Sequence, residues 1–275
     1  MGILTNNPVL QREVRGRLRL KRRGSVKANL WIARLLGLGV AYFYARGMIG
    51  LWHGTMQDAR DFWPLLVYST LVLIVLLAPA LAATAITQER EQQTWEILAT
   101  TQLSAAEVLG GKWVGRQLIP WLLVVILAPF YAVCVARAEL GGLMLPAVLA
   151  FLLVTIAGYS AMGLLCSFQA RRTMTATAAA LTVSAVLCIG TVVIDQVSGM
   201  LLSRGFGYQY GPALWLNPFY ALTTLMSQIS PNLGGVDPRA DPSLVNWYFL
   251  LMITATAAAL GFMVRRYHHS VRERS

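Results

Sequence analysis

The amino-acid sequence predicts an all-α membrane protein with about six transmembrane helices. Of the 275 residues, 56% are hydrophobic and only 13% are charged, whereas about 25% of the residues in a soluble domain carry a charge. A helix that crosses the hydrocarbon core of a bilayer needs about 20 mostly apolar residues. The chain is therefore expected to cross the membrane several times. The candidate spans are residues 30–52, 64–86, 113–136, 143–167, 174–200 and 246–264.

Lysine and arginine residues are distributed unevenly among the connections between these spans. The formal net charge is +11, and most of the basic residues fall before residue 30, near residues 90–116 and 171–172, or after residue 264. Cytoplasmic connections of membrane proteins are enriched in such residues. We therefore expect both termini to lie in the cytoplasm, which agrees with an even number of spans. The same distribution points to contact with membrane lipid and not with nucleic acid.

The first 29 residues are predicted to form a basic, amphipathic connector helix on the cytoplasmic side, ahead of the first span. Apolar residues recur at a spacing of four at Leu10, Val14 and Leu18, so they share one face of a helix. Arginines occupy a different face: Arg12, Arg15, Arg19 and Arg22. A helix of this kind lies in the membrane interface beside anionic lipid. The alternative is a tail whose charges only orient the first span.

The lengths of the connections predict the remaining organisation. Residues 30–264 are expected to form one six-helix transmembrane domain, and residues 265–275 a basic cytoplasmic tail. The long connection at residues 201–244 is rich in proline and glycine, which mark turns, and also in aromatic residues. Backbone that enters the bilayer must form its hydrogen bonds internally. We therefore predict short helices within this external loop.

A polar insert at residues 87–111 separates the second and third spans. Glu89, Gln92, Gln93 and Glu96 lie at spacings of three and four from one another, which places them on one face of a helix. A face this acidic would be repelled by the anionic inner leaflet, so a basic protein partner explains it better. The insert is therefore a candidate docking site. The alternative is a solvated connection with no partner.

A second helix is predicted to begin near the end of this insert. Ser104 and Glu107 have the spacing of a capping box, in which each side chain bonds to the backbone of the other residue. An apolar run follows directly and leads into the third span. The insert therefore has the pattern of a helix, a turn and a second helix on the cytoplasmic side.

Three stretches of the sequence carry a resemblance to a known family. They are residues 7–19 (NPVLQREVRGRLR), residues 86–112 (ITQEREQQTWEILATTQLSAAEVLGGK) and residues 216–222 (LNPFYAL). The middle stretch is similar to the segment between the second and third spans of type-2 ABC exporter permeases. The first stretch resembles the connector helix before the first span of the same family, and the third resembles a segment after its fifth span.

This resemblance implies a coupling helix within residues 87–111. In such permeases the segment after the second span docks into a groove on a separate ATP-binding subunit and transmits the closure of that subunit to the membrane. By the resemblance, Lys112 would lie near the membrane boundary. The chain would be a multi-pass protein of the bacterial inner membrane that exports its substrate. The residues that would contact the ATPase are Glu89, Glu91, Thr94 and Glu96.

ATP itself is not expected to bind this chain. A Walker A loop has the pattern G-x-x-x-x-G-K-[ST], whereas Gly111 and Lys112 are followed by Trp113 within a helical pattern. ATP and Mg²⁺ are therefore expected on a partner ATPase subunit, and no cofactor is expected on this chain. Six spans are few for a translocation path, so a second permease chain, identical or related, is expected to pair with this one.

The predicted spans hold few residues suited to chemistry. Arg46 lies about three-quarters of the way across the first span by helical rise, where it would either line a pathway or extend its guanidinium group to the outer surface. The sequence contains no H-E-x-x-H zinc motif and no G-x-S-x-G nucleophile motif, and no metal site is predicted. We therefore expect a transport subunit and not an enzyme.

The leading hypothesis is the membrane-spanning permease subunit of an ABC transporter. A second hypothesis is a membrane anchor that recruits a cytoplasmic partner through the same acidic insert. A third is a secondary transporter, which would need acidic residues inside the spans to bind a coupling ion, and these are scarce. A neighbouring gene with a Walker A motif would favour the first hypothesis over the other two.

Overall fold

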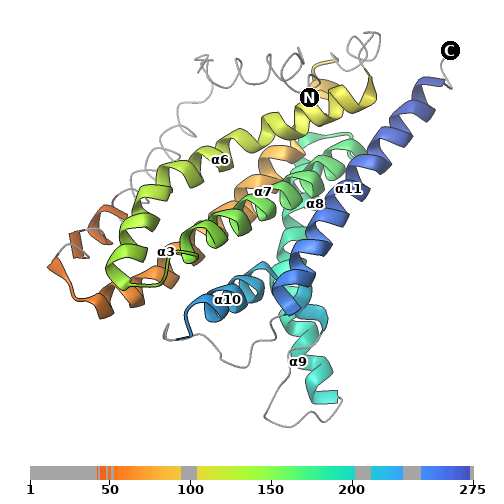
Figure 1. The fold of residues 1–275 in the computed structure, drawn as a ribbon. Helices are drawn as coiled ribbons and strands as arrows, with labels where there is room; N and C mark the ends of the chain where they lie inside the picture. The colour runs from red at the N-terminus through yellow and green to blue at the C-terminus, as the bar shows by residue number, and fades with distance from the viewer. Residues whose placement is uncertain are drawn as a thin grey trace.

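The computed structural model describes residues 42, 44–47, 49–50, 53–93, 104–201, 212–231 and 243–272. All regular secondary structure in this part of the chain is helical (Figure 1). The longer helices are α3 (Met56–Ala83), α6 (Ala105–Ala138), α7 (Met144–Gln169), α8 (Thr173–Ala185) and α11 (Ser243–Arg272). The shorter elements are α4 (Thr87–Glu91), a π-helical turn (Val186–Gly190), α9 (Thr191–Leu201), a 3₁₀ turn (Pro212–Leu216) and α10 (Pro218–Ile229).

Five helical segments in the described part are long and apolar enough to cross a membrane. They are Met56–Glu91, Ala105–Ala138, Met144–Gln169, Thr173–Leu201 and Ser243–Tyr267. These segments correspond to the second to sixth spans predicted from the sequence, so the prediction of an all-α membrane protein is confirmed. The connector helix at residues 1–29 and most of the first predicted span lie outside the described residues. The total of six spans and the orientation of the termini therefore remain predictions.

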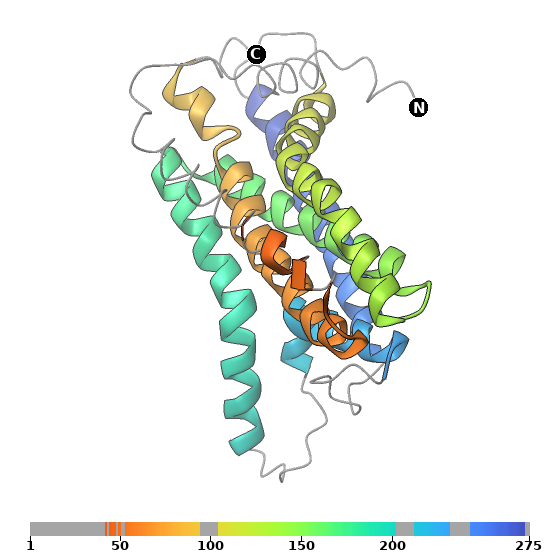
Figure 2. The same ribbon diagram turned by 90° about the vertical axis from the view of Figure 1, so that its left-hand side faces the viewer.

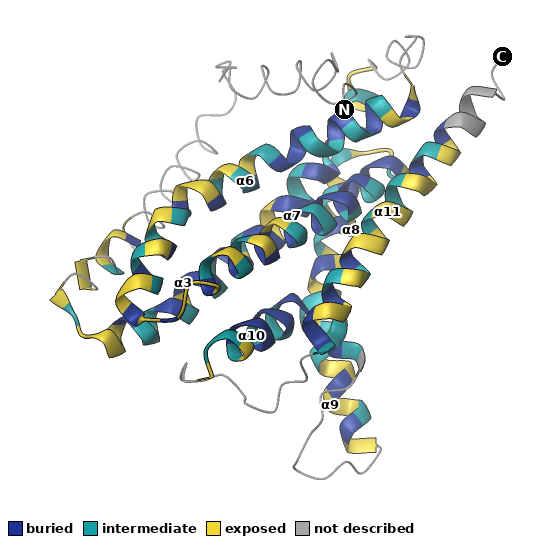
Figure 3. Ribbon diagram, in the orientation of Figure 1, coloured by how far each residue is buried: buried dark blue, intermediate teal, exposed yellow. Residues whose placement is uncertain are grey.

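Helices α3 and α7 form the centre of the bundle. In their most apolar stretches, 50% of the residues of α3 and 56% of those of α7 are buried, compared with 17% for α8–α9 and for α11. Helices α6 and α8 contact both central helices, and α11 contacts α7. Figure 3 shows the buried residues concentrated on the central helices, whereas α11 exposes much of its surface. The outer helices therefore offer apolar surface to lipid or to other chains.

Pairs of hydroxyl groups join helices inside the apolar core. The hydroxyl of Tyr131 on α6 donates to Thr70 Oγ1 on α3 at 2.7 Å. The hydroxyl oxygens of Thr155 on α7 and Tyr248 on α11 are 2.9 Å apart. Both threonine hydroxyls also donate to a carbonyl oxygen of their own helix. Because a buried hydroxyl without a partner is costly, the two tyrosines are stable here only because a neighbouring helix supplies an acceptor. The pairs therefore specify which helix faces meet.

A glycine allows the two central helices to approach each other closely. A Cβ atom at Gly163 of α7 would lie 2.4 Å from the carbonyl oxygen of Pro79 on α3, and 2.8 Å from its Cα atom. Both are backbone atoms, which no side-chain rotation can move away. The helices therefore meet backbone to backbone, and a larger residue at position 163 must push them apart.

Asn217 attaches α10 to the span formed by α8 and α9. Its side-chain oxygen accepts hydrogen bonds from the N–H groups of Phe219 (2.9 Å) and Tyr220 (3.4 Å), so it caps α10. Its side-chain nitrogen donates to the carbonyl oxygen of Cys188 (2.7 Å) and to Thr191 Oγ1 (2.9 Å). The Cys188 carbonyl lies in the π-helical turn, where the regular α-helical bonding is interrupted. The asparagine of the LNPFYAL stretch thus serves both as a cap and as a bridge.

Substitution of Gly163 by alanine should destabilise the bundle. Overpacking of this contact is expected to cost about 1–3 kcal/mol, more than the gain of up to about 1 kcal/mol that alanine brings to a helix. Gly261→Ala is the matched control, since a Cβ atom at Gly261 of α11 would meet nothing within 4 Å. Size-exclusion chromatography after heating in detergent should show a lower thermal midpoint for Gly163→Ala alone. Equal midpoints for the two variants would contradict the close approach.

Two substitutions separate the roles of Asn217. Asn217→Ser keeps an oxygen that can cap α10 but removes the two amide hydrogen bonds, whereas Asn217→Ala removes the cap as well. We expect Asn217→Ser to lower the thermal midpoint because the bridge to the π-helical turn is lost. Asn217→Ala should destabilise the protein by about 1 kcal/mol more, the typical contribution of an N-cap. A wild-type midpoint for Asn217→Ser would show that the bridge does not contribute.

Candidate functional site

The candidate site is the junction between α3 and α4, at one end of the bundle. Helix α4 lies at the same end as the C-terminal part of α11, and at the opposite end from α9 (Figure 2). Helix α3 ends at Ala83, residues 84–86 form a turn, and α4 begins at Thr87. The junction therefore contains the described beginning of the polar insert.

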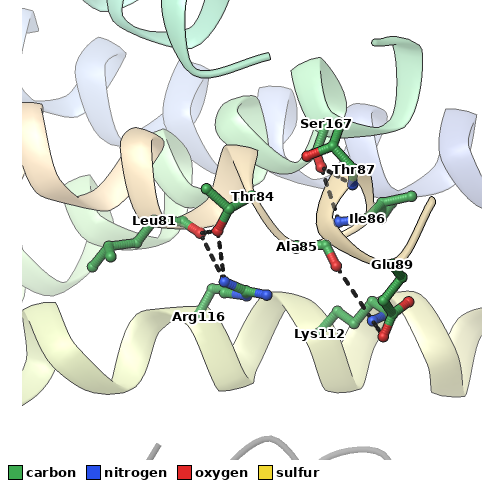
Figure 4. A network of polar contacts seen from close by, with 9 residues as sticks. All are labelled: Leu81, Thr84, Ala85, Ile86, Thr87, Glu89, Lys112, Arg116 and Ser167. Carbon is green, nitrogen blue, oxygen red and sulfur yellow. Dashed lines mark hydrogen bonds and ion pairs between the residues drawn. The ribbon is translucent and has the colours of Figure 1, made fainter. Parts of the chain in front are cut away.

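A serine on α7 caps α4. Ile86 precedes α4 and has no side chain that can bond to the first N–H groups of the helix. Instead, Ser167 Oγ accepts hydrogen bonds from the N–H of Ile86 at 2.9 Å and from the N–H of Thr87 at 3.2 Å (Figure 4). All of these groups are buried. Because buried N–H groups at a helix start need partners, the hydroxyl from α7 stabilises the turn.

A buried lysine on α6 contacts α4 from another direction. The Lys112 side chain is 1% exposed, and its Nζ atom lies 2.5 Å from Glu89 Oε1. The same atom donates to the carbonyl oxygen of Ala85 at 3.4 Å (Figure 4). A buried charge is very costly unless it is paired and hydrogen-bonded. The pair therefore determines where α4 lies relative to α6.

Arg116 lies one helical turn after Lys112, on the same face of α6. Its Nη1 atom donates to Thr84 Oγ1 at 2.7 Å and to the carbonyl oxygen of Leu81 at 3.3 Å. The last carbonyl groups of a helix have no partners within the helix, and the helix dipole also favours a cation there. Arg116 therefore stabilises the end of α3 where the chain turns.

Two further side chains connect α4 to the start of α8. Arg90 Nη1 donates to the carbonyl oxygen of Ala170, between α7 and α8, at 2.7 Å. Glu91 Oε1 accepts a hydrogen bond from the N–H of Thr173, the first residue of α8, at 2.7 Å. Arg172 precedes α8 and makes no cap with its own side chain, so Glu91 serves as the capping acceptor. Helix α4 is thus bonded to α6, α7 and α8 together.

The second helix of the insert begins as the sequence predicts. The N–H of Ser104 donates to Glu107 Oε2 at 2.9 Å, and the N–H of Glu107 donates to Ser104 Oγ at 3.2 Å. This reciprocal pair confirms the predicted capping box. Helix α6 then continues without a break to Ala138, so the second helix of the insert and the third predicted span are one element.

The first helix of the insert is shorter than the sequence predicts. Helix α4 ends at Glu91, and Gln92 and Gln93 form a turn in which Gln93 has a φ of 57°. A residue in this left-handed conformation ends a helix. The prediction that Glu89, Gln92 and Gln93 share one helical face is therefore wrong.

The predicted docking residues point in different directions where they are described. Glu89 faces Lys112 on α6, whereas Glu91 is exposed and bonds to the start of α8. Thr94 and Glu96 lie outside the described residues. Contact of these four residues with an ATPase remains a prediction.

Most of the side chains that hold α4 and the turn before it in place could not be identified from the sequence. The distribution of basic residues along the sequence assigns Lys112 and Arg116 to a cytoplasmic connection. In the structure both residues lie on α6 and are buried. Their spacing of four within an apolar run is the signal that could reveal them. No local signal indicates Ser167, which is about 80 residues from the N–H groups that it binds.

The other candidate groups lie away from this junction. The Arg46 side chain is exposed, and its place on a pathway remains a prediction. Among the described residues, no three His, Cys, Asp or Glu side chains lie close enough together to hold a metal ion.

Comparison of the amino-acid sequence with models of protein families gives a match. The family model of the ABC-2 family transporter protein matches residues 17–269. No curated protein matches the chain. The family match includes all five described spans and the whole polar insert. The chain therefore belongs to the ABC-2 transporter family of membrane proteins.

Proposed function

We propose that this chain is the permease subunit of an ABC transporter that exports its substrate with ATP hydrolysed by a separate subunit. The family match supports a membrane permease, and permeases of this family work with ATP-binding cassette subunits. The observation that carries the proposal is that α4 bonds through side chains to α6, α7 and α8 at once. A subunit that moves α4 would therefore move three membrane-spanning helices.

The ATPase docks on the segment that begins at the exposed end of α4. Glu91 is exposed at this end, and the chain continues from it to Thr94 and Glu96. We assign these three residues to contacts with basic groups of the ATPase. Glu89 already contacts the buried ammonium group of Lys112. Its role in ATPase binding is therefore indirect: it holds α4 in the position at which the ATPase docks.

Closure of the ATPase on ATP displaces α4 in this mechanism. The displacement reaches α6 through Lys112, α7 through Ser167 and α8 through Thr173. Two permease chains, identical or related, form the translocation path between them, and Arg46 is a candidate residue of that path. ATP and Mg²⁺ stay on the ATPase. We place the complex in a bacterial inner membrane.

A tagged, full-length chain should copurify with an ATP-binding subunit in mild detergent. The partner should carry a Walker A motif and be encoded beside the permease, and the complex should hydrolyse ATP. Purification of the permease without an ATPase, from cells that express the neighbouring genes, would favour a membrane anchor or a secondary transporter instead.

Charge reversal distinguishes the roles of the two glutamates of α4. Glu89→Lys leaves the buried Lys112 without its partner and should destabilise the junction by about 3–5 kcal/mol, with loss of ATPase binding. The exchange Glu89→Lys/Lys112→Glu restores an opposite pair and should recover most of that binding. Glu91→Lys should weaken ATPase binding, and because it removes the cap of α8 it should also lower the thermal midpoint, much less than Glu89→Lys does. Copurified ATPase activity and the thermal midpoint of the permease are the two measurements.

Glu139→Lys is the matched control for these variants. Glu139 is an exposed carboxylate in the turn after α6, at the opposite end of that helix from the junction, and its reversal should change neither measurement. If the exchange variant folds normally but fails to recover ATPase binding, Glu89 contacts the ATPase directly. Full ATPase binding by both Glu89→Lys and Glu91→Lys would contradict the docking proposal.

A further inference from the structure

Three arginines from separate elements come together at the end of the bundle that carries α4. Arg90 lies on α4, Arg171 between α7 and α8, and Arg266 near the end of α11. The hydrogen bond from Arg90 goes to Ala170, directly before Arg171. The Arg90 guanidinium group also lies 5.9 Å from the centre of the Phe168 ring. Arg90 is therefore held against the C-terminal end of α7.

Helix α11 packs against the same C-terminal end of α7. Phe168 shares a buried apolar cluster with Met263, which precedes Arg266 by one helical turn. The contacts of Arg90 with Ala170 and Phe168 therefore bring Arg171 and Arg266 near enough for their positive charges to act on its guanidinium group. Like charges repel one another. An anion between them would therefore be bound favourably.

The carboxylates of α4 are engaged elsewhere. Glu89 pairs with Lys112, and Glu91 accepts a hydrogen bond from the start of α8. In the part of the chain that the structure describes, neither Arg171 nor Arg266 forms an ion pair. The described chain thus supplies no carboxylate to these two arginines, and an external anion can approach them.

Exposed apolar side chains lie next to these charges. The Arg266 guanidinium group lies 6.0 Å from the ring centre of Phe262, which is 46% exposed and one turn further into the span. Met174, which is 84% exposed, follows Arg171 at the start of α8. Arginines at the ends of spans place their charge at headgroup level above the apolar surface. A phospholipid matches both parts of this surface, whereas a soluble acidic protein would leave the apolar side chains uncovered.

We propose that Arg90, Arg171 and Arg266 bind the headgroup of an anionic phospholipid, and that the apolar side chains beside them contact its acyl chains. Arginine is suited to this task because its planar guanidinium group donates several hydrogen bonds to one phosphate. Arg90 also bonds α4 to the α7–α8 turn, so the bound lipid stabilises the position of α4. The lipid site is independent of the proposed transport function.

Native mass spectrometry of the full-length chain in detergent tests the site. The protein is titrated with phosphatidylglycerol or with phosphatidylcholine of the same acyl chains. Wild type should prefer phosphatidylglycerol, and Arg171→Gln/Arg266→Gln should bind it about thirty-fold more weakly, from the loss of two basic residues near an anionic headgroup. Binding of phosphatidylcholine should not change.

The matched control is Arg172→Gln/Arg265→Gln, which removes the same charge at neighbouring exposed positions. It should bind phosphatidylglycerol nearly as wild type does. Equal weakening in both double variants would overturn the proposal, because it would show only a diffuse effect of surface charge. Equal affinity of wild type for the two lipids would also overturn it, without any variant. Loss of a copurifying ATPase from Arg171→Gln/Arg266→Gln with lipid affinity intact would instead identify a protein-docking surface.

Discussion

The position of α4 depends on one buried positive charge, the ammonium group of Lys112. Such a charge must have a partner inside the protein, because its transfer from water costs several kcal/mol. Glu89 supplies that partner from α4. A helix of only five residues is too short to be stable by itself. Its conformation and its place therefore follow from this ion pair and from the groups that satisfy its backbone.

The same hydrogen bonds that complete the helix ends also connect the helices. Helix α4 receives its cap from Ser167 on α7, α8 receives its cap from Glu91 on α4, and the end of α3 receives a donor from Arg116 on α6. Since buried backbone groups must be paired, the buried cap from Ser167 cannot be given up without a replacement, whereas water can replace Glu91 at the exposed start of α8. The mechanical connection between the insert and the spans is thus a consequence of the hydrogen-bonding requirement.

Local features of this protein could be predicted from its sequence, and contacts between distant segments could not. The spans are evident because apolar length is a local property, and the capping box of Ser104 and Glu107 is evident because it lies within four residues. The end of α4 at Glu91 was not predicted, since Gln93 gives no sign of a left-handed conformation. The burial of Lys112 depends on where α3 ends in space. A count of charges in connections cannot supply that information.

The close approach of Gly163 and Pro79 has a geometric consequence for the central helices. With no side chain at position 163 between them, the two backbones form a crossing that has little freedom to slide. Pro79 has no N–H group, so one backbone hydrogen bond of α3 is missing at this same point, and a helix bends most easily at such a residue. About 6 Å of helix lies between Pro79 and the end of α3 at Ala83, and about 22 Å lies between Pro79 and Pro64. A sideways shift of α4 would therefore bend the short end of α3 at the crossing, while the longer part keeps its place against α7.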